Sequence, residues 1–173
     1  MNLRTTAGIV TLTMAVGGLV GSTVLAANAA PTARAQAAVA PCTSIGARLG
    51  GAQGAAGSTY QTLRLRNTSH VTCTLDGYPT VAYVNIHKRM IGWPAKPEAT
   101  RHPRTVTLRP GAVAKAVLQI PDPGDFSPVD CLAHNANKIR VGTGHDRTPS
   151  YITWNRSECT TKFARSFIMA IHR

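Results

Sequence analysis

The chain is poor in aromatic side chains and in negative charge. Of its 173 residues 5% are aromatic, and 7 Asp and Glu stand against 19 Lys and Arg, for a formal net charge of +12. The 43% share of hydrophobic residues is too high for a disordered chain, and the length allows no more than one or two domains. The 15 Gly and 11 Pro predict many turns, which argues against a coiled coil, a helical bundle or a polytopic membrane protein.

The amino-terminal segment lacks charge over a long stretch. No charged residue occurs between Arg4 and Arg34, and the apolar run ends at the small-residue sequence Ala27-Asn28-Ala29. This pattern predicts a signal peptide over 1–29, cleaved after Ala29, with cleavage after Ala35 as the second choice. An uncleaved membrane anchor is the alternative, because such a run is long enough to span ~30 Å of hydrocarbon.

Two other export signals are missing from this segment. The chain has no twin-Arg pair, and Pro41 directly before Cys42 is a poor match to a lipobox. We therefore expect a secreted protein with no stable membrane anchor after cleavage. It would consist of a flexible lead-in over 30–41 and a single domain over 42–173.

All the cysteines lie downstream of the predicted signal peptide, at Cys42, Cys73, Cys131 and Cys159. An even number of cysteines in an exported chain indicates two disulfides. A zinc site is the alternative, but zinc ligands usually occur in close CxxC-type pairs, and these cysteines are far apart. Of the three possible connectivities we predict Cys42–Cys73 and Cys131–Cys159, because each pair then closes a moderate loop at one end of the domain.

Alternation of apolar and polar residues predicts the first strands of the domain. In the stretch 59–66 one face consists of Gln61, Leu63 and Leu65. The opposite, wet face consists of Tyr60, Thr62, Arg64 and Arg66. A turn at 67–69 leads into 70–75, where Val71, Cys73 and Leu75 would face inward. These two stretches predict a hairpin with one buried and one solvated face.

Further β-rich runs follow, separated by Gly and Pro turns. They cover 80–86, 90–93, 105–108, 112–120, 137–141, 150–154 and 163–171. His87-Lys88-Arg89 is the expected tip of one hairpin, and Ser44–Leu49 is compatible with a single helical turn. About eight short strands of this kind predict an all-β fold, an antiparallel β-sandwich that is Ig-like in general architecture.

Several segments, taken in order, resemble a known family. They are Gly54–Tyr60 before the strand with Leu63 and Leu65, Asn67-Thr68-Ser69, Cys73-Thr74-Leu75-Asp76-Gly77-Tyr78-Pro79, Leu108-Arg109-Pro110-Gly111, Cys131 and Cys159. Over about 42–171 the chain resembles the secreted actinobacterial family called domain of unknown function 4232. The resemblance implies export and a β-rich domain, and it brings no catalytic or binding residues. This chain departs from many members in having neither a lipobox nor a Ser/Thr/Pro-rich spacer, and in being unusually basic.

No catalytic motif is recognisable in the sequence. The best adjacent acid–imidazole pair is His145-Asp146, but neighbouring side chains of an extended chain point apart, so a solvated turn is the simpler interpretation. No G-x-S-x-G surrounds Ser58, no H-E-x-x-H occurs, and the six His have no metal-ligand spacing. We therefore predict a non-enzymatic domain without cofactor or metal. A secreted hydrolase or an enzyme inhibitor with an unrecognised site is the alternative.

The excess of basic residues predicts attraction to anions. The candidate anion-binding residues are Arg64 and Arg66 on the wet strand face, Lys88 and Arg89 at the hairpin tip, and Arg101 and Arg104 in a Pro-flanked loop. If they meet on one side, they form a patch for an anionic cell-wall polymer or an acidic protein. Scattered arginines that only keep the protein soluble are the alternative. Nucleic acid is not expected as a partner, because export removes the usual target and few aromatics are available to stack on bases.

Overall fold

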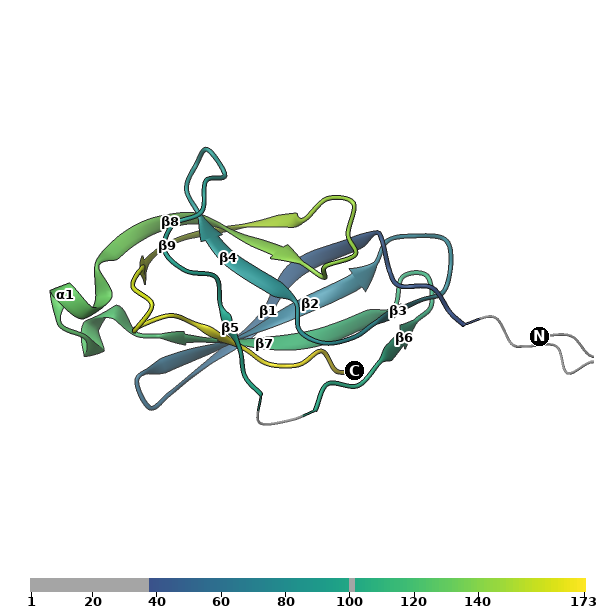
Figure 1. Cartoon of the computed structure of the whole chain (residues 1–173), viewed down its shortest axis with the longest axis horizontal. Coiled ribbons are helices and arrows are strands. Elements are labelled where there is room, and N and C mark those ends of the chain that lie inside the picture. Colours follow the sequence, from purple (N-terminus) through teal and green to yellow (C-terminus); the bar gives the residue numbers. More distant parts are fainter. Residues whose placement is uncertain (1–37, 100–101) are drawn as a thin grey trace, which may run out of the picture. The chain divides into compact units, whose positions relative to one another are not determined.

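The computed structural model describes residues 38–99 and 102–173, which form a domain of packed β-sheets (Figure 1). The predicted signal peptide over 1–29, most of the lead-in and Arg101 lie outside the described residues.

The first layer is a five-stranded sheet in the order β1-β2-β7-β10-β5. Its strands are β1 (Ile45–Ala55), β2 (Ser58–Asn67), β7 (Val113–Pro121), β10 (Phe167–Ile168) and β5 (Lys96–Pro97). The pairings in this sheet are antiparallel except for β10 with β5, which is parallel. The two long strands β2 and β7 therefore lie inside the sheet, between the edge strands β1 and β5.

The second layer is a three-stranded antiparallel sheet in the order β4-β8-β9. Its strands are β4 (Thr80–Val84), β8 (Ala133–Gly142) and β9 (Ser150–Cys159). A small sheet of β3 (Cys73–Leu75) and β6 (Val106–Leu108) lies at one end of the domain, and the short α1 (Pro128–Cys131), preceded by η1 (Pro123–Asp125), lies at the opposite end (Figure 1).

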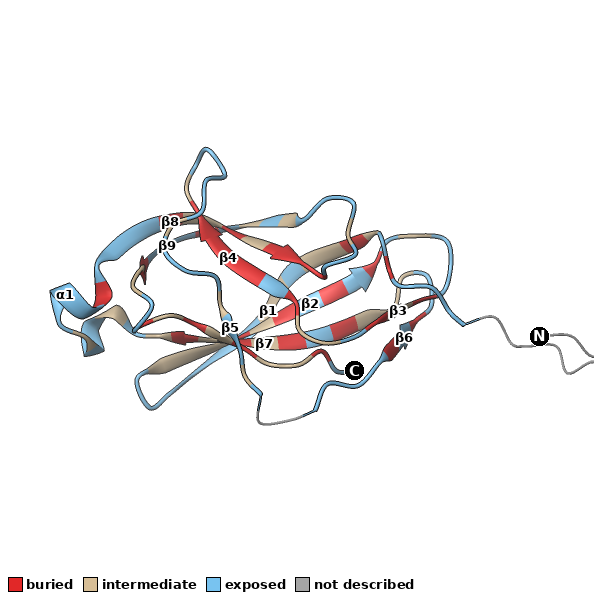
Figure 2. Cartoon of the chain, viewed as in Figure 1, coloured by how far each residue is buried: buried red, intermediate tan, exposed pale blue. Residues whose placement is uncertain are grey.

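Buried and exposed residues alternate along the strands (Figure 2), and the buried side chains form the core between the layers. Inward-facing residues with less than 5% exposure include Leu63, Leu65, Ala114, Ala116 and Leu118 from the first sheet, and Val81, Tyr83, Ile139 and Val141 from the second. Their burial supplies the main stabilisation of the fold, at roughly 25 cal/mol per Å² of apolar surface. The prediction of an all-β sandwich is confirmed, with ten strands instead of about eight.

Both predicted disulfides are present, Cys42–Cys73 and Cys131–Cys159. The first joins the segment before β1 to β3. The second joins the end of α1 to the end of β9. Because the cysteines are engaged in disulfides, they supply no zinc ligands.

The expected helical turn over Ser44–Leu49 is wrong, because Ile45–Leu49 is the start of β1 and pairs with β2. The strand continues through a bulge, where the register shifts between Leu49 and Ala52. The side chain of Gln61 donates hydrogen bonds to the carbonyls of Gly50 and Gly51, at 3.0 and 3.3 Å. A glycine-rich strand with a bulge has no regular two-residue alternation, which is why the sequence did not reveal it.

The expected hairpin between 59–66 and 70–75 is also wrong. β2 pairs with β1 and β7, whereas β3 pairs with β6 in a separate sheet. The actual hairpin is β1–β2, with a two-residue turn in which Ala56 and Gly57 have φ of 46° and 71°. Val71, predicted to face inward, is 66% exposed, because the chain leaves the first sheet at Asn67.

Two segments have a different structure from the one predicted. The stretch 163–171 contains only the two-residue strand β10. The last residues of the lead-in are held rather than free, because the amide of Thr74 donates to the carbonyl of Ala40 at 2.9 Å and Pro41 forms a parallel bridge with Thr74.

Candidate anion-binding face

A row of basic residues crosses the outer face of the five-stranded sheet. The strand register places Arg48 of β1 opposite Arg64 of β2, and Arg64 opposite Lys115 of β7. Lys115 in turn is bridged to His172, and their backbones exchange hydrogen bonds of 2.7 and 2.9 Å. Directly opposed residues of antiparallel strands point to the same face, so these four exposed side chains form one line, which we call the basic row.

The basic row carries no compensating negative charge. In the described part of the chain, which includes all seven acidic residues, Arg48, Arg64 and Lys115 form no ion pair and no side-chain hydrogen bond. Like charges directly opposite each other on neighbouring strands destabilise a sheet, by roughly 0.2–1 kcal/mol per pair. The protein therefore tolerates a repulsive arrangement on this face.

Two members of the basic row, Arg48 and Arg64, line an open groove of about 930 Å³. The groove is lined by Gly46, Arg48, Leu49, Arg64, Arg66, Asn67, Thr68, Ser69, His70, Pro110, Gly111 and Val113. Arg66 extends over Gly111, where a Cβ would lie 3.4 Å from its Nη2 atom. Three arginines from two adjacent strands therefore face this groove, without a carboxylate among its lining residues.

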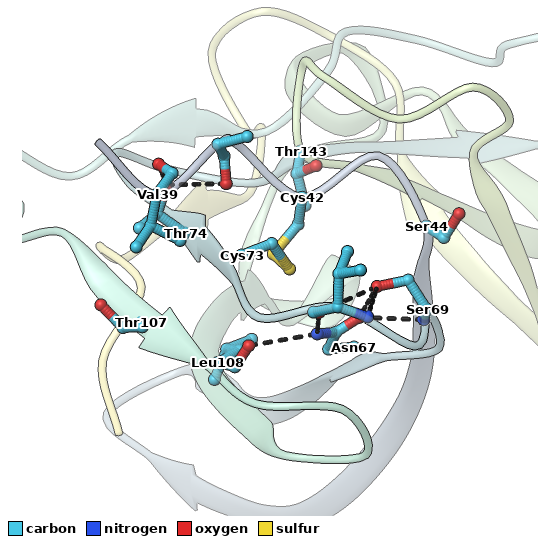
Figure 3. Close-up of a disulfide and its surroundings, with 12 residues drawn as sticks. Val39, Cys42, Ser44, Asn67, Ser69, Cys73, Thr74, Thr107, Leu108 and Thr143 are labelled. Atoms are coloured by element: carbon cyan, nitrogen blue, oxygen red, sulfur yellow. Dashed lines mark hydrogen bonds between the residues drawn. A yellow bond between two sulfur atoms is a disulfide. The ribbon is translucent and has the colours of Figure 1, made fainter. Parts of the chain in front are cut away.

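Asn67 is one of the lining residues of the groove, and its hydrogen bonds to Ser69 and Leu108 are drawn in Figure 3. Its fully buried side chain donates to the carbonyls of Val71 and Leu108, at 2.8 and 3.1 Å. It also accepts hydrogen bonds from the amide and hydroxyl of Ser69, at 2.9 and 2.7 Å. These bonds fix the loop that carries Thr68, Ser69 and His70 beside Arg66.

β1 is held in place by the second layer. The hydroxyl of Ser150 accepts from the amide of Ala47 at 3.0 Å and donates to the carbonyl of Ile45 at 3.1 Å. This contact satisfies backbone groups at the edge of the sheet and sets the position of Arg48, which follows directly in the chain.

The candidate anion-binding residues that were predicted from the sequence do not all lie at one site in the structure. Arg64 and Arg66 come together on the groove. Lys88 and Arg89 lie in a turn after β4, where the Nζ of Lys88 is 4.9 Å from the ring centre of Tyr151 in β9 of the same three-stranded sheet. Arg104 is exposed before β6 and does not line the groove, and Arg101 lies outside the described residues.

Sequence reasoning missed Arg48, Lys115, His70 and His172. Lys115 alternates with the buried Ala114 and Ala116, so its outward direction was readable from the period of two. Arg48 was hidden because its segment was assigned to a helical turn. The register that aligns the row depends on pairing between distant strands, which no local pattern encodes.

The adjacent pair His145-Asp146 has a structural role. The carboxylate of Asp146 accepts hydrogen bonds from the amide and the hydroxyl of Thr143, which closes the turn between β8 and β9. His145 is exposed. Among residues 38–99 and 102–173, no group of three or more His, Cys, Asp or Glu is placed to hold a metal ion.

One acid is buried away from the groove. Glu158 is 3% exposed and accepts a hydrogen bond of 2.6 Å from the indole N–H of Trp154. Nearby, the hydroxyls of Tyr83 and Ser166 are 2.7 Å apart. Burial raises the pKa of Glu158 from 4.5 to about 7, although the bonds from Trp154 and Tyr83 and the charge of Arg156 oppose this. Burial likewise raises the pKa of Tyr83.

Comparison with known protein families gives a match over most of the domain. The model of a domain of unknown function (DUF4232) matches residues 42–165. No curated protein and no solved structure matches the chain. In the described part of the chain no helix is long and apolar enough to cross a membrane.

Proposed function

Because the chain belongs to the DUF4232 family, whose members' task is unknown, we propose from its own surface that it is a secreted, non-enzymatic domain that binds an anionic partner. The observation that carries this proposal is the basic row, in which Arg48, Arg64 and Lys115 are aligned without a carboxylate in contact. The disulfides support export, because such bonds form and persist in oxidising compartments.

Electrostatics favours a bound anion on this face. A negative group on the groove would replace repulsion between neighbouring cations with attraction to several of them at once. The guanidinium groups of Arg48, Arg64 and Arg66 each have free N–H donors, which match the oxygens of a carboxylate or phosphate. Outside the cell the partner would be an anionic cell-wall polymer or an acidic protein.

The composition of the groove supports binding over catalysis. His70 is the one imidazole among the groove's lining residues, and these residues include no carboxylate that acts with it as a second acid or base. In the adjacent His145-Asp146 pair, the carboxylate of Asp146 already accepts hydrogen bonds from Thr143 within a turn.

The first test is cosedimentation with purified bacterial cell walls. We expect retention at low salt that disappears by a few hundred millimolar, since the Debye length falls to roughly 3 Å at 1 M salt. The triple variant Arg48→Gln, Arg64→Gln, Lys115→Gln should lose retention. A matched variant with the same loss of charge, Lys88→Gln, Arg89→Gln, Arg104→Gln, should keep it. Equal loss in both variants would mean that scattered charge, and not the basic row, is responsible.

Secretion is tested separately by mass spectrometry of the protein recovered outside the producing cell. We expect a new amino terminus at Ala30, or at Gln36 for the second cleavage site. Retention of Met1 would overturn this part of the proposal.

A further inference from the structure

We infer that the basic row binds a linear phosphate-bearing polymer that lies across the strands, in the groove at Arg48 and Arg64 and beyond its lining at Lys115. This inference rests on the proposed function and specifies its ligand.

The outer face forms a small grid whose charges follow one direction. Three adjacent strands contribute three residues each, and residues on a line across the strands are opposed in the register, apart from Gly50. The first line consists of Gly46, Arg66 and Val113. The second consists of Arg48, Arg64 and Lys115. In the third, Thr62 is opposed to Val117, and Gly50 of the bulge in β1 lies next to Thr62, where a Cβ on Gly50 would be 3.2 Å from the Cβ of Thr62.

Only the second line is basic in all its members, and His172 extends it by one strand. Along the strands, by contrast, a basic residue is followed by uncharged ones: Gly46 and Gly50 flank Arg48, and Val113 and Val117 flank Lys115. β2 alone has two, because Arg66 follows Arg64 on the same face. The favoured path for a string of negative groups therefore runs perpendicular to the strands.

The length of the row exceeds the reach of one small anion. Neighbouring strands lie roughly 4.7–4.9 Å apart, so the backbone positions from Arg48 to His172 span roughly 14 Å. A single phosphate contacts one or two of these side chains. A chain with a negative group on every repeat contacts all of them, and each further contact is made without a new loss of translational freedom.

The chemistry of the side chains and the shape of the groove agree with this ligand. The guanidinium forks of Arg48 and Arg64 bind the oxygens of phosphate in pairs, and the ammonium of Lys115 binds phosphate as a point charge. A small-molecule site normally encloses most of its ligand, whereas this groove is open on one side. On an open surface the bound polymer can extend beyond both ends of the basic row.

The test compares orthophosphate, tripolyphosphate and long-chain inorganic polyphosphate by calorimetric titration at low salt. We expect the affinity per chain to rise at least tenfold from tripolyphosphate to a chain longer than the row. Arg64→Gln in the middle of the row should weaken long-chain binding and reduce the slope of log affinity against log salt by about 1. Arg66→Gln removes the same charge from the groove but outside the row, and should have the smaller effect. Arg89→Gln, in the turn after β4, is the matched control for the loss of one charge.

The possible failures are distinguishable. If the triple variant loses retention on cell walls but orthophosphate binds as tightly as long-chain polyphosphate, the anion-binding function stands and the polymer inference falls. Equal effects of Arg64→Gln and Arg66→Gln would overturn the direction across the strands. Equally tight binding of polyglutamate of matching length would overturn the assignment of phosphate. If neither cell walls nor any phosphate is bound, both proposals fail.

Discussion

The buried carboxyl of Glu158 makes the stability of this domain depend on pH in a predictable direction. Its pKa is about 7 in the folded protein against an ordinary value of 4.5. The folded state therefore binds the proton more tightly than the unfolded chain does. The stabilising contribution of the neutral carboxyl is fully present below pH 4.5, and it is lost as the pH rises through about 7.

The size of the effect follows from the difference between the two pKa values. Each unit corresponds to 1.36 kcal/mol, so ionised Glu158 should lower the free energy of unfolding by about 3 kcal/mol at pH 8 relative to pH 4. Glu158→Gln keeps the size of the side chain and an oxygen that accepts from Trp154. It should therefore be similar to the wild type at pH 4 and more stable by about 3 kcal/mol at pH 8.

Urea unfolding of both proteins at the two pH values measures this difference. Subtracting the variant from the wild type removes the contributions of the other titrating groups, including the histidines. Asp76→Asn, which removes an exposed carboxylate, is the matched control and should show no comparable change. A constant difference between Glu158→Gln and wild type at both pH values would refute the reasoning.

Three further predictions concern the framework of the domain. Cys42→Ser with Cys73→Ser should lower the free energy of unfolding by about 3 kcal/mol in urea, because the bond closes a loop of 31 residues. Asn67→Ala should lower it by about 2–4 kcal/mol, because the carbonyls of Val71 and Leu108 lose their donor, and Asn67→Asp should not restore it. Gly92→Ala should lower the Tm measured by circular dichroism, because φ is +65° and a Cβ would lie 2.6 Å from the Cα of Thr160. An unchanged stability in any of these variants would contradict the contact named for it.

The all-β architecture could be predicted because the alternation of apolar and polar residues is a local feature of the sequence. Leu63 and Leu65 alternate with Arg64 and Arg66, and the structure buries the first pair and exposes the second. The disulfide pairing was also accessible, since each bond joins cysteines that are neighbours along the chain.

Strand partners were not accessible in the same way. The stretches around Leu65 and Cys73 look like one hairpin because only a short turn separates them. Instead, the buried side chain of Asn67 accepts a hydrogen bond from the amide of Ser69 and donates one to the carbonyl of Leu108 in β6. The chain then leaves the first sheet and enters the small sheet of β3 and β6. The basic row depends on this pairing, and so Arg64 could be named from the sequence whereas its neighbours Arg48 and Lys115 could not.

The Cys42–Cys73 bond determines which strands bear a force that is applied to the amino-terminal end of the domain. β1 begins only three residues after Cys42 and forms the edge of its sheet, so tension alone would peel it away one hydrogen bond at a time. The sulfur bridge diverts part of that tension into β3, which belongs to another sheet. A domain held by its leading end could thus keep Arg48 in register while a ligand pulls on the groove.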